Sequence, residues 1–93
     1  MKSAHFYLRK KGFFPISDVI DVSDSEAVAC CHRLAKTEGF FVGGSSGLNL
    51  SACQKLSKHL CKGVIVTILC DHGIKYLSKI YNPSFLQEQQ IEV

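Results

Sequence analysis

In two stretches of the chain, apolar or small residues recur every three to four positions, which is the spacing of a helix with one buried face. In the first stretch these residues are Ala27, Cys30, Cys31, Leu34 and Ala35. Ser23 and Glu26 occupy the two positions of a capping box, in which each side chain accepts from the other residue's backbone N–H. Gly39 suits the left-handed position just after a helix. The pattern therefore predicts a helix from behind Ser23 to about Glu38.

The second helical stretch follows a run of glycines and serines. Its apolar face consists of Leu48, Ala52, Leu56 and Leu60, with Cys53 beside them and Ser51, Lys55 and Lys58 on the polar side. Lys62 and Gly63 are expected to end this helix. A third, shorter helix is predicted over residues 74–80, and the pair Asn82 and Pro83 is expected to stop it, because proline cannot continue a helix.

Three short runs favour extended structure. Residues 18–22 are a short β-rich stretch, and residues 39–42 form a short extended segment between the two helices. Residues 64–69, Val-Ile-Val-Thr-Ile-Leu, are apolar on both faces, which is typical of a central parallel strand covered by helices. The order strand, helix, short strand, helix, strand, helix predicts an α/β fold, with a small parallel sheet and flanking helices.

The two ends of the chain carry weaker patterns. Residues 1–15 are a poorly readable N-terminal segment, in which residues 5–8 suit either a short strand or a loose end. Residues 16–86 make up the α/β domain, and the polar tail of residues 87–93 is expected to fray. A sheet of three strands leaves its edges open, and open edges pair with other chains. We therefore expect the domain to be part of a larger assembly.

Residues 40–47, Phe-Phe-Val-Gly-Gly-Ser-Ser-Gly, carry the main candidate chemistry. The apolar run stops at two glycines, which let the backbone turn sharply and let a ligand approach closely. A serine suits the N-cap of the following helix, whose free N–H groups favour anions. The junction is therefore either a polar-ligand site or a Gly-Ser turn with a capped helix. The turn at residues 70–73 follows the other strand, where ligands of open α/β sheets bind.

Composition limits these hypotheses. The 93 residues suffice for one small domain, and the net charge of +3 is too small to argue for nucleic-acid binding. For the basic cluster Arg9, Lys10 and Lys11, a solvated turn is favoured over a phosphate contact. No apolar run approaches the length of a membrane span, and the first five residues lack the apolar core of a signal peptide.

The five cysteines are an odd number and include no Cys-x-x-Cys pair, which argues against a disulfide framework and for a reducing compartment. We therefore expect a cytoplasmic protein. His59 with Cys61, and Cys70 with His72, are residue types that bind zinc, but their spacing matches no strong zinc pattern. Cysteines that act as small buried apolar side chains are the favoured interpretation, and no metal site is predicted.

Three separated runs resemble one enzyme family in order and spacing. They are residues 22–27, residues 38–47, and residues 66–73 with the Tyr-Leu-Ser that follows at 76–78. Together they resemble cysteine synthase and its relative cystathionine β-synthase, which are pyridoxal-phosphate enzymes of the tryptophan-synthase-β fold type. The resemblance covers about residues 18–86. It implies the C-terminal portion of that fold and pyridoxal phosphate as the cofactor of the family.

The resemblance also implies site residues. In this family the first serine of the Gly-Gly-Ser-Ser-Gly motif bonds the pyridine nitrogen of the cofactor, and that serine is Ser45. The remaining cofactor-binding residues that it implies are Gly43, Gly44 and Gly47, which shape the pocket, and Asp71 and His72, which lie nearby. For Asp71 and His72, turn chemistry is the alternative, because aspartate favours turns.

Two departures bear on activity. The family's Schiff-base lysine and its phosphate-binding loop belong to segments far upstream of the matched region, and no lysine of this chain occupies a matching context. The resemblance thus implies a C-terminal fragment of an enzyme that replaces the acetate of O-acetylserine with sulfide to give cysteine, inactive on its own and without a catalytic residue here. Within the family, a cystathionine β-synthase-type reaction of serine with homocysteine is the alternative.

Other classes remain open. The chain is alternatively a non-catalytic interaction module or a split-enzyme subunit, and a stand-alone anion-binding module rests on the Gly-Ser junction alone. The expected partners are the missing lysine-bearing part of the enzyme or a homodimer partner, with a small amino acid as substrate. Neither nucleic acid nor a membrane is expected as a partner.

Overall fold

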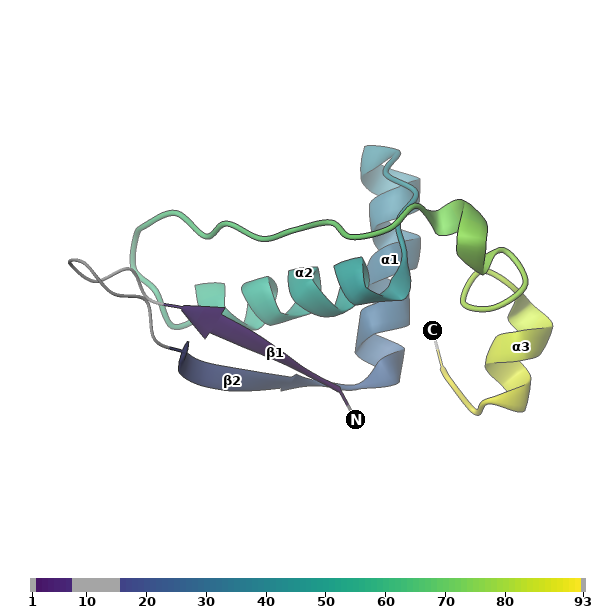
Figure 1. Ribbon diagram of the computed structural model, residues 1–93, viewed down its shortest axis with the longest axis horizontal. Helices are drawn as coiled ribbons and strands as arrows, with labels where there is room; N and C mark the ends of the chain where they lie inside the picture. Colours follow the sequence, from purple (N-terminus) through teal and green to yellow (C-terminus); the bar gives the residue numbers. More distant parts are fainter. Residues whose placement is uncertain (1, 8–15, 93) are drawn as a thin grey trace.

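The computed structural model describes the backbone of residues 2–7 and 16–92 and the side chains of residues 19–92. In chain order the elements are β1 (Lys2–Tyr7), β2 (Ile16–Val22), α1 (Asp24–Glu38), α2 (Gly44–Ser57), a 3₁₀ helix (Gly73–Tyr76) and α3 (Pro83–Glu88) (Figure 1). The class is α/β, as predicted. The basic cluster at residues 9–11, predicted to be a solvated turn, lies outside the described residues.

The sheet of the described residues is an antiparallel pair. β1 and β2 align from Lys2 opposite Val22 to Tyr7 opposite Ile16, with one irregularity near the end of β1. The strand predicted at residues 18–22 is confirmed and begins two residues earlier. The predicted parallel sheet is wrong for the part of the chain described, because the runs expected to supply its other strands do not join a ladder. The sheet forms instead between two strands that are neighbours in sequence.

Residues 64–69 are the largest departure from the predicted fold. They are extended but belong to no strand, and no described residue hydrogen-bonds to the backbone of residues 64–67. The segment runs along α2 (Figure 1), where the Asn49 amide donates to the carbonyl of Ile68 at 3.1 Å. Val64 is 89% exposed and Val66 is 86% exposed. An apolar strand becomes part of a sheet only beside a second strand, and none of the described residues supplies one.

The short extended segment predicted at residues 39–42 is reduced to one antiparallel bridge, between Val42 and His72. Two backbone hydrogen bonds flank it. Gly73 N–H donates to the carbonyl of Phe41 at 2.9 Å, and Gly43 N–H donates to the carbonyl of Asp71 at 3.3 Å. This bridge joins the entry of α2 to the turn at residues 70–73, so the two glycine turns identified in the sequence do lie side by side.

Helix α1 follows the prediction closely. Glu26 N–H donates to Ser23 Oγ at 3.1 Å and Ser23 N–H donates to Glu26 Oε1 at 2.9 Å, which completes the capping box. The helix ends at Glu38, and Gly39 follows in the left-handed conformation with φ of 73°. Glu26 also pairs with Lys55 of α2, with 2.9 Å between Nζ and Oε2. This ion pair ties the start of α1 to the last turn of α2.

Helix α2 begins at Gly44, before the serine expected to cap it, and ends at Ser57, several residues before Lys62 and Gly63. It crosses α1 and packs on the hairpin of β1 and β2 (Figure 1). The core between these elements consists of Val22, Ala27 and Ala52, with Ile20 and Leu48 partly buried against it. At the helix crossing, a Cβ added to Gly47 would lie 2.2 Å from the Ala27 carbonyl oxygen. The crossing is therefore close enough to require glycine there.

The last part of the chain departs from the predicted helix over residues 74–80. The structure has a 3₁₀ helix at Gly73–Tyr76 followed by turns. Asn82 and Pro83 do not stop a helix but start α3, since Asn82 Oδ1 accepts from Ser84 N–H at 3.0 Å and proline occupies the first turn. Proline is well suited to a first turn, whose N–H groups lack partners within the helix.

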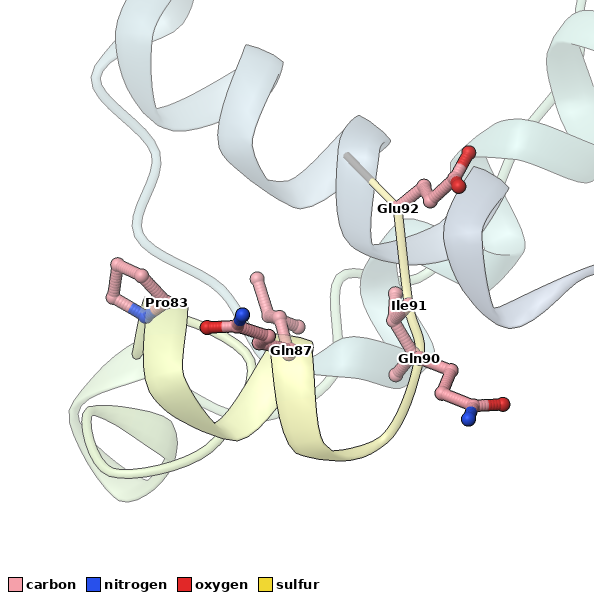
Figure 2. Close-up of a pocket in the computed structure, with 6 residues that line it drawn as sticks. Pro83, Gln87, Gln90, Ile91 and Glu92 are labelled. Atoms are coloured by element: carbon pink, nitrogen blue, oxygen red, sulfur yellow. The ribbon is translucent and has the colours of Figure 1, made fainter.

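The tail is also more ordered than predicted. Residues 87 and 88 belong to α3, and the chain then reverses at Gln90, whose φ is 56°. Ile91 N–H donates to the Leu86 carbonyl at 2.8 Å, and Glu92 N–H donates to Ser25 Oγ at 3.2 Å. Figure 2 shows the hollow that this return leaves beside α3, lined by Pro83, Leu86, Gln87, Gln90, Ile91 and Glu92. The tail thus ends against the first turn of α1.

Candidate functional site

The two serines of the Gly-Ser junction have opposite environments. Ser46 is fully buried, and its hydroxyl donates to the carbonyl of Cys70. Ser45 is exposed, and no described residue hydrogen-bonds to its hydroxyl. The hydroxyl of Ser46 is therefore occupied in holding the end of the extended segment at residues 64–69, whereas that of Ser45 is available to a ligand.

Neither serine caps α2, so the predicted serine N-cap is wrong. The helix begins at Gly44, and Gly43 is the N-cap residue, with no side-chain hydrogen bond. The Gly43 carbonyl accepts from the N–H groups of Ser46 at 3.1 Å and Gly47 at 3.4 Å. Ser45 lies inside the first turn, where its N–H has no partner within the helix. Its backbone and its hydroxyl are thus both free to meet a polar group.

Ser45 opens onto a cavity of about 410 Å³ between the N-terminal turns of α1 and α2, the residues after the 3₁₀ helix, and α3. The polar lining residues are Asp24, Ser45, Tyr76, Lys79 and Gln89, and the remainder are Ala27, Val28, Gly44, Ile80, Phe85 and Ile91. The cavity carries one ammonium group and one carboxylate, so its lining is close to neutral. Such a mixture of apolar walls and a few polar groups suits a small organic ligand.

The glycines of the motif have different surroundings. Gly44 lines the cavity, and the nearest atom to a Cβ added there is 3.9 Å away. A Cβ on Gly43 would lie 2.8 Å from Cε2 of Tyr76 and 3.0 Å from Cβ of Asp71. Gly47 faces α1 at the helix crossing. Close packing therefore accounts for glycine at Gly43 and Gly47, and the role of all three in binding a cofactor stays a prediction.

Asp71 and His72 are engaged in turn contacts. His72 Nδ1 accepts from Ile74 N–H at 3.2 Å and caps the 3₁₀ helix. The Asp71 carboxylate accepts from the Tyr76 hydroxyl at 2.8 Å and from Lys75 Nζ at 3.3 Å. These two donors, Tyr76 first, lower the pKa of Asp71, and the same bond raises the pKa of Tyr76. Neither Asp71 nor His72 lines the cavity, so their assignment to the cofactor stays a prediction beside a structural role.

The sequence pattern did not reveal a group of side chains that lie far from the Gly-Ser junction in sequence but hold its backbone in place. The Tyr81 hydroxyl donates to the carbonyl of Val42, and Cys31 Sγ donates to the carbonyl of Gly43 at 3.4 Å. The ring of His32 stacks on that of Tyr81 with centroids 5.3 Å apart, and His32 Nε2 donates to the Ile80 carbonyl at 2.8 Å. No local pattern marks these residues, because every one of these contacts joins positions at least 12 residues apart.

Other kinds of site find no support in the residues described. No group of three or more histidine, cysteine or acidic side chains gathers there in a way that would hold a metal ion. No helix in the described ranges is both long enough and apolar enough to cross a membrane. The cysteines at positions 30, 31, 53, 61 and 70 are all free thiols.

Comparisons with known proteins agree with the resemblance of the motifs. The family model of the pyridoxal-phosphate dependent enzymes matches residues 12–71. A cysteine synthase of Dictyostelium discoideum is 42% identical over 72 residues, which are 76% of this chain and 19% of that protein. Cysteine synthase 2 of Schizosaccharomyces pombe is 45% identical over 71 residues, 75% of this chain and 18% of its own length.

A third relative has a different name. The N-(2-amino-2-carboxyethyl)-L-glutamate synthase of Ralstonia nicotianae is 42% identical over 72 residues, 76% of this chain and 21% of that protein. The chain thus spans about a fifth of the length of the curated relatives it matches. Because the family model covers well over half of the 93 residues, the chain belongs to the family of pyridoxal-phosphate dependent enzymes that includes the cysteine synthases.

Proposed function

We propose that this chain is the C-terminal piece of a cysteine synthase-like enzyme, and that it brings Ser45 to the ring nitrogen of pyridoxal phosphate but is inactive alone. The observation that carries the proposal is the contrast between the serines of the family motif. Ser46 is buried and bonded to Cys70, whereas the hydroxyl of Ser45 is exposed at the edge of a cavity. A ring nitrogen is an acceptor of the kind that this free hydroxyl lacks.

The residues present suit the ring end of the cofactor. When bound, pyridoxal phosphate withdraws electrons from the substrate attached to it, and the protein tunes how strongly it does so. A serine hydroxyl donates its own proton toward the ring nitrogen but does not hold an additional proton there, as a carboxylate would. Ser45 would thus leave the ring a weaker electron acceptor than a carboxylate would, which would favour loss and replacement of a β-substituent. Ile80 and Phe85 supply apolar walls to the same cavity.

The reaction we propose is replacement of the acetate of O-acetylserine by sulfide to give cysteine. Two of the relatives compared above are named cysteine synthases, and they support this choice. These 93 residues offer no lysine in the context of the family's Schiff-base residue, so covalent attachment of the cofactor requires a lysine outside them. Five free thiols support a reducing, cytoplasmic setting for the whole.

The partner we propose is a separate lysine-bearing part of the same kind of enzyme. The face of residues 64–69 supports it, since Val64, Val66 and Ile68 are 89%, 86% and 70% exposed and lie at alternate positions. In the described structure the backbone of residues 64–67 also lacks hydrogen-bond partners. A strand with a free edge and an uncovered apolar face accepts an incoming strand by sheet addition.

A complementation experiment tests both the inactivity of the chain alone and the role of Ser45. The full chain is combined with a cysteine synthase truncated before the region that matches this chain, and cysteine formation from O-acetylserine and sulfide is followed. We expect no turnover from either piece alone and measurable turnover from the mixture, with Ser45→Ala lowering it on the order of tenfold through loss of one hydrogen bond. Ser57→Ala, at the far end of α2, is the control and should leave the rate unchanged.

Each other outcome has a defined meaning. Turnover by the chain alone contradicts its inactivity. Binding of the truncated enzyme without turnover supports a non-catalytic interaction module, and self-association measured by light scattering, with no binding, supports a homodimer instead. Equal rates for Ser45→Ala and the parent at equal cofactor occupancy would contradict the role assigned to Ser45.

A further inference from the structure

The entry of α2 lacks the local features that normally fix a helix start. Gly43 is the N-cap and offers no side-chain acceptor to the first turn. Gly44 follows it, and two successive glycines leave the backbone more conformations than any other pair. A glycine entry without a cap would leave the first turn, and with it Ser45, free to move. The structure must therefore hold this entry by other means.

Three parts of the chain supply those means. The Tyr81 hydroxyl donates to the Val42 carbonyl, the Cys31 thiol donates to the Gly43 carbonyl at 3.4 Å, and Gly43 N–H donates to the Asp71 carbonyl at 3.3 Å. The two consecutive carbonyls before Gly44 are therefore each bonded to a side chain from a distant element. Val42 is 6% exposed and Cys31 is fully buried, so the bond from Cys31 is shielded from water, and the bond from Tyr81 is partly buried.

The ring of Tyr81 is itself held by contacts with two other rings. His32 stacks against it with ring planes 11° apart, and Phe41 packs on it with centroids 4.6 Å apart. His32 also donates to the carbonyl of Ile80, the residue before Tyr81, at 2.8 Å. The hydroxyl therefore has little freedom to leave Val42, which makes Tyr81 a rigid donor.

We propose that Tyr81 and Cys31 are positioning residues, which hold the Val42 and Gly43 carbonyls so that Ser45 keeps its place at the cavity. The inference rests on the proposed function only for what Ser45 meets there. The position of Ser45 itself depends only on residues of this chain. Burial raises the pKa of Tyr81 to about 12 and also raises the pKa of Cys31. Both groups thus stay protonated, and stay donors, at every pH near neutrality.

Hydrogen exchange of the full chain, without cofactor, tests the placement. The reporting amides are Gly43, Ser46, Gly47 and Gly73, all bonded at or beside the junction. Tyr81→Phe keeps the ring and removes the hydroxyl. We expect its junction amides to exchange about tenfold faster while the amides of α1 are unchanged, because an unpartnered buried carbonyl weakens only its own surroundings. Val22→Ala, in the core away from the junction, is the control and should speed all protected amides together.

A second pair of variants keeps the test decisive if Tyr81→Phe does not fold. Cys31→Ala removes the donor to Gly43, and Cys31→Ser restores one of similar size. Junction exchange should rise in Cys31→Ala and return most of the way in Cys31→Ser. Uniform acceleration in Tyr81→Phe, equal exchange in the two Cys31 variants, or an unprotected junction in the parent chain overturns the proposal. Failure of complementation with normal junction protection would instead count against the proposed function alone.

Discussion

The two long helices begin in contrasting ways. α1 is capped by its own residues, since Ser23 and Glu26 exchange hydrogen bonds within one turn. α2 starts at a bare glycine and depends on Tyr81, Cys31 and the turn at Asp71 to hold its entry. A helix start that is capped by its own residues does not depend on the rest of the fold. A start that is held by distant residues forms only when the tertiary structure does. The second arrangement leaves the first turn of α2 clear of capping side chains, so that Ser45 is free for a ligand.

The largest expected effect comes from disrupting the crossing of α1 and α2, which brings the two helix starts together. Gly47→Ala should destabilise the chain by about 3 kcal/mol, because its Cβ would lie 2.2 Å from the Ala27 carbonyl oxygen and 2.4 Å from Cys31 Sγ. Chemical denaturation followed by circular dichroism measures the change. Gly44→Ala is the matched control, with no atom nearer than 3.9 Å, and should shift stability by less than about 1 kcal/mol. Equal losses in the two variants would contradict the close crossing.

A medium effect separates the two kinds of helix start. Ser23→Ala should cost about 1 kcal/mol, because it removes the acceptor that Glu26 N–H uses. Ser45→Ala should cost almost nothing, because no described residue bonds to that hydroxyl. Thermal melts of the two variants measure the difference. If Ser45→Ala loses as much stability as Ser23→Ala, then Ser45 acts as a cap and its availability to a ligand is refuted.

The smallest effect concerns pH and the ion pair between the two helices. Lys55, with the capping-box contacts, lowers the pKa of Glu26 from 4.5 to about 2. A lowered pKa in the folded state means that this stabilisation is complete above pH 4.5 and is lost as the pH falls toward 2. The side chains are 37% and 44% exposed, so the pair contributes less than about 1 kcal/mol.

Urea titrations between pH 2 and pH 6 measure this slope. Lys55→Met should reduce the dependence on pH in that window. Lys36→Met, which removes an exposed lysine from the last turn of α1, should leave it unchanged. A slope that Lys55→Met does not alter would show that the capping box alone accounts for the lowered pKa.

Local signals determined which elements could be predicted. The extent of α1 follows from a capping box and a terminal glycine, both within the segment they describe. Residues 64–69 carry a strong strand pattern, but a strand requires a neighbour, and its pattern cannot tell whether the same chain supplies one. Asn82 and Pro83 carry one signal with two meanings, since the pair ends one helix as readily as it starts another.

The candidate site likewise has a part that could be predicted from the sequence and a part that could not. The resemblance of the motif singled out Ser45 rather than Ser46; Ser45 is exposed and Ser46 is buried, and the cofactor role of Ser45 stays a prediction. The hydrogen bonds that hold the Val42 and Gly43 carbonyls could not be predicted, because Tyr81 lies 39 residues from the carbonyl it bonds and nothing near it in sequence marks the contact. Long-range hydrogen bonds depend on how the elements pack, which one sequence without a structure does not reveal.

The uncovered segment at residues 64–69 also bears on how long the chain survives in a cell. Proteases and chaperones both bind extended apolar peptides with free backbone groups, and residues 64–67 present both in the described structure. A bound partner strand would hide the segment from either. With the partner proposed above, the abundance of the chain would then follow the supply of that partner, so that an unpaired copy would be removed rather than accumulated.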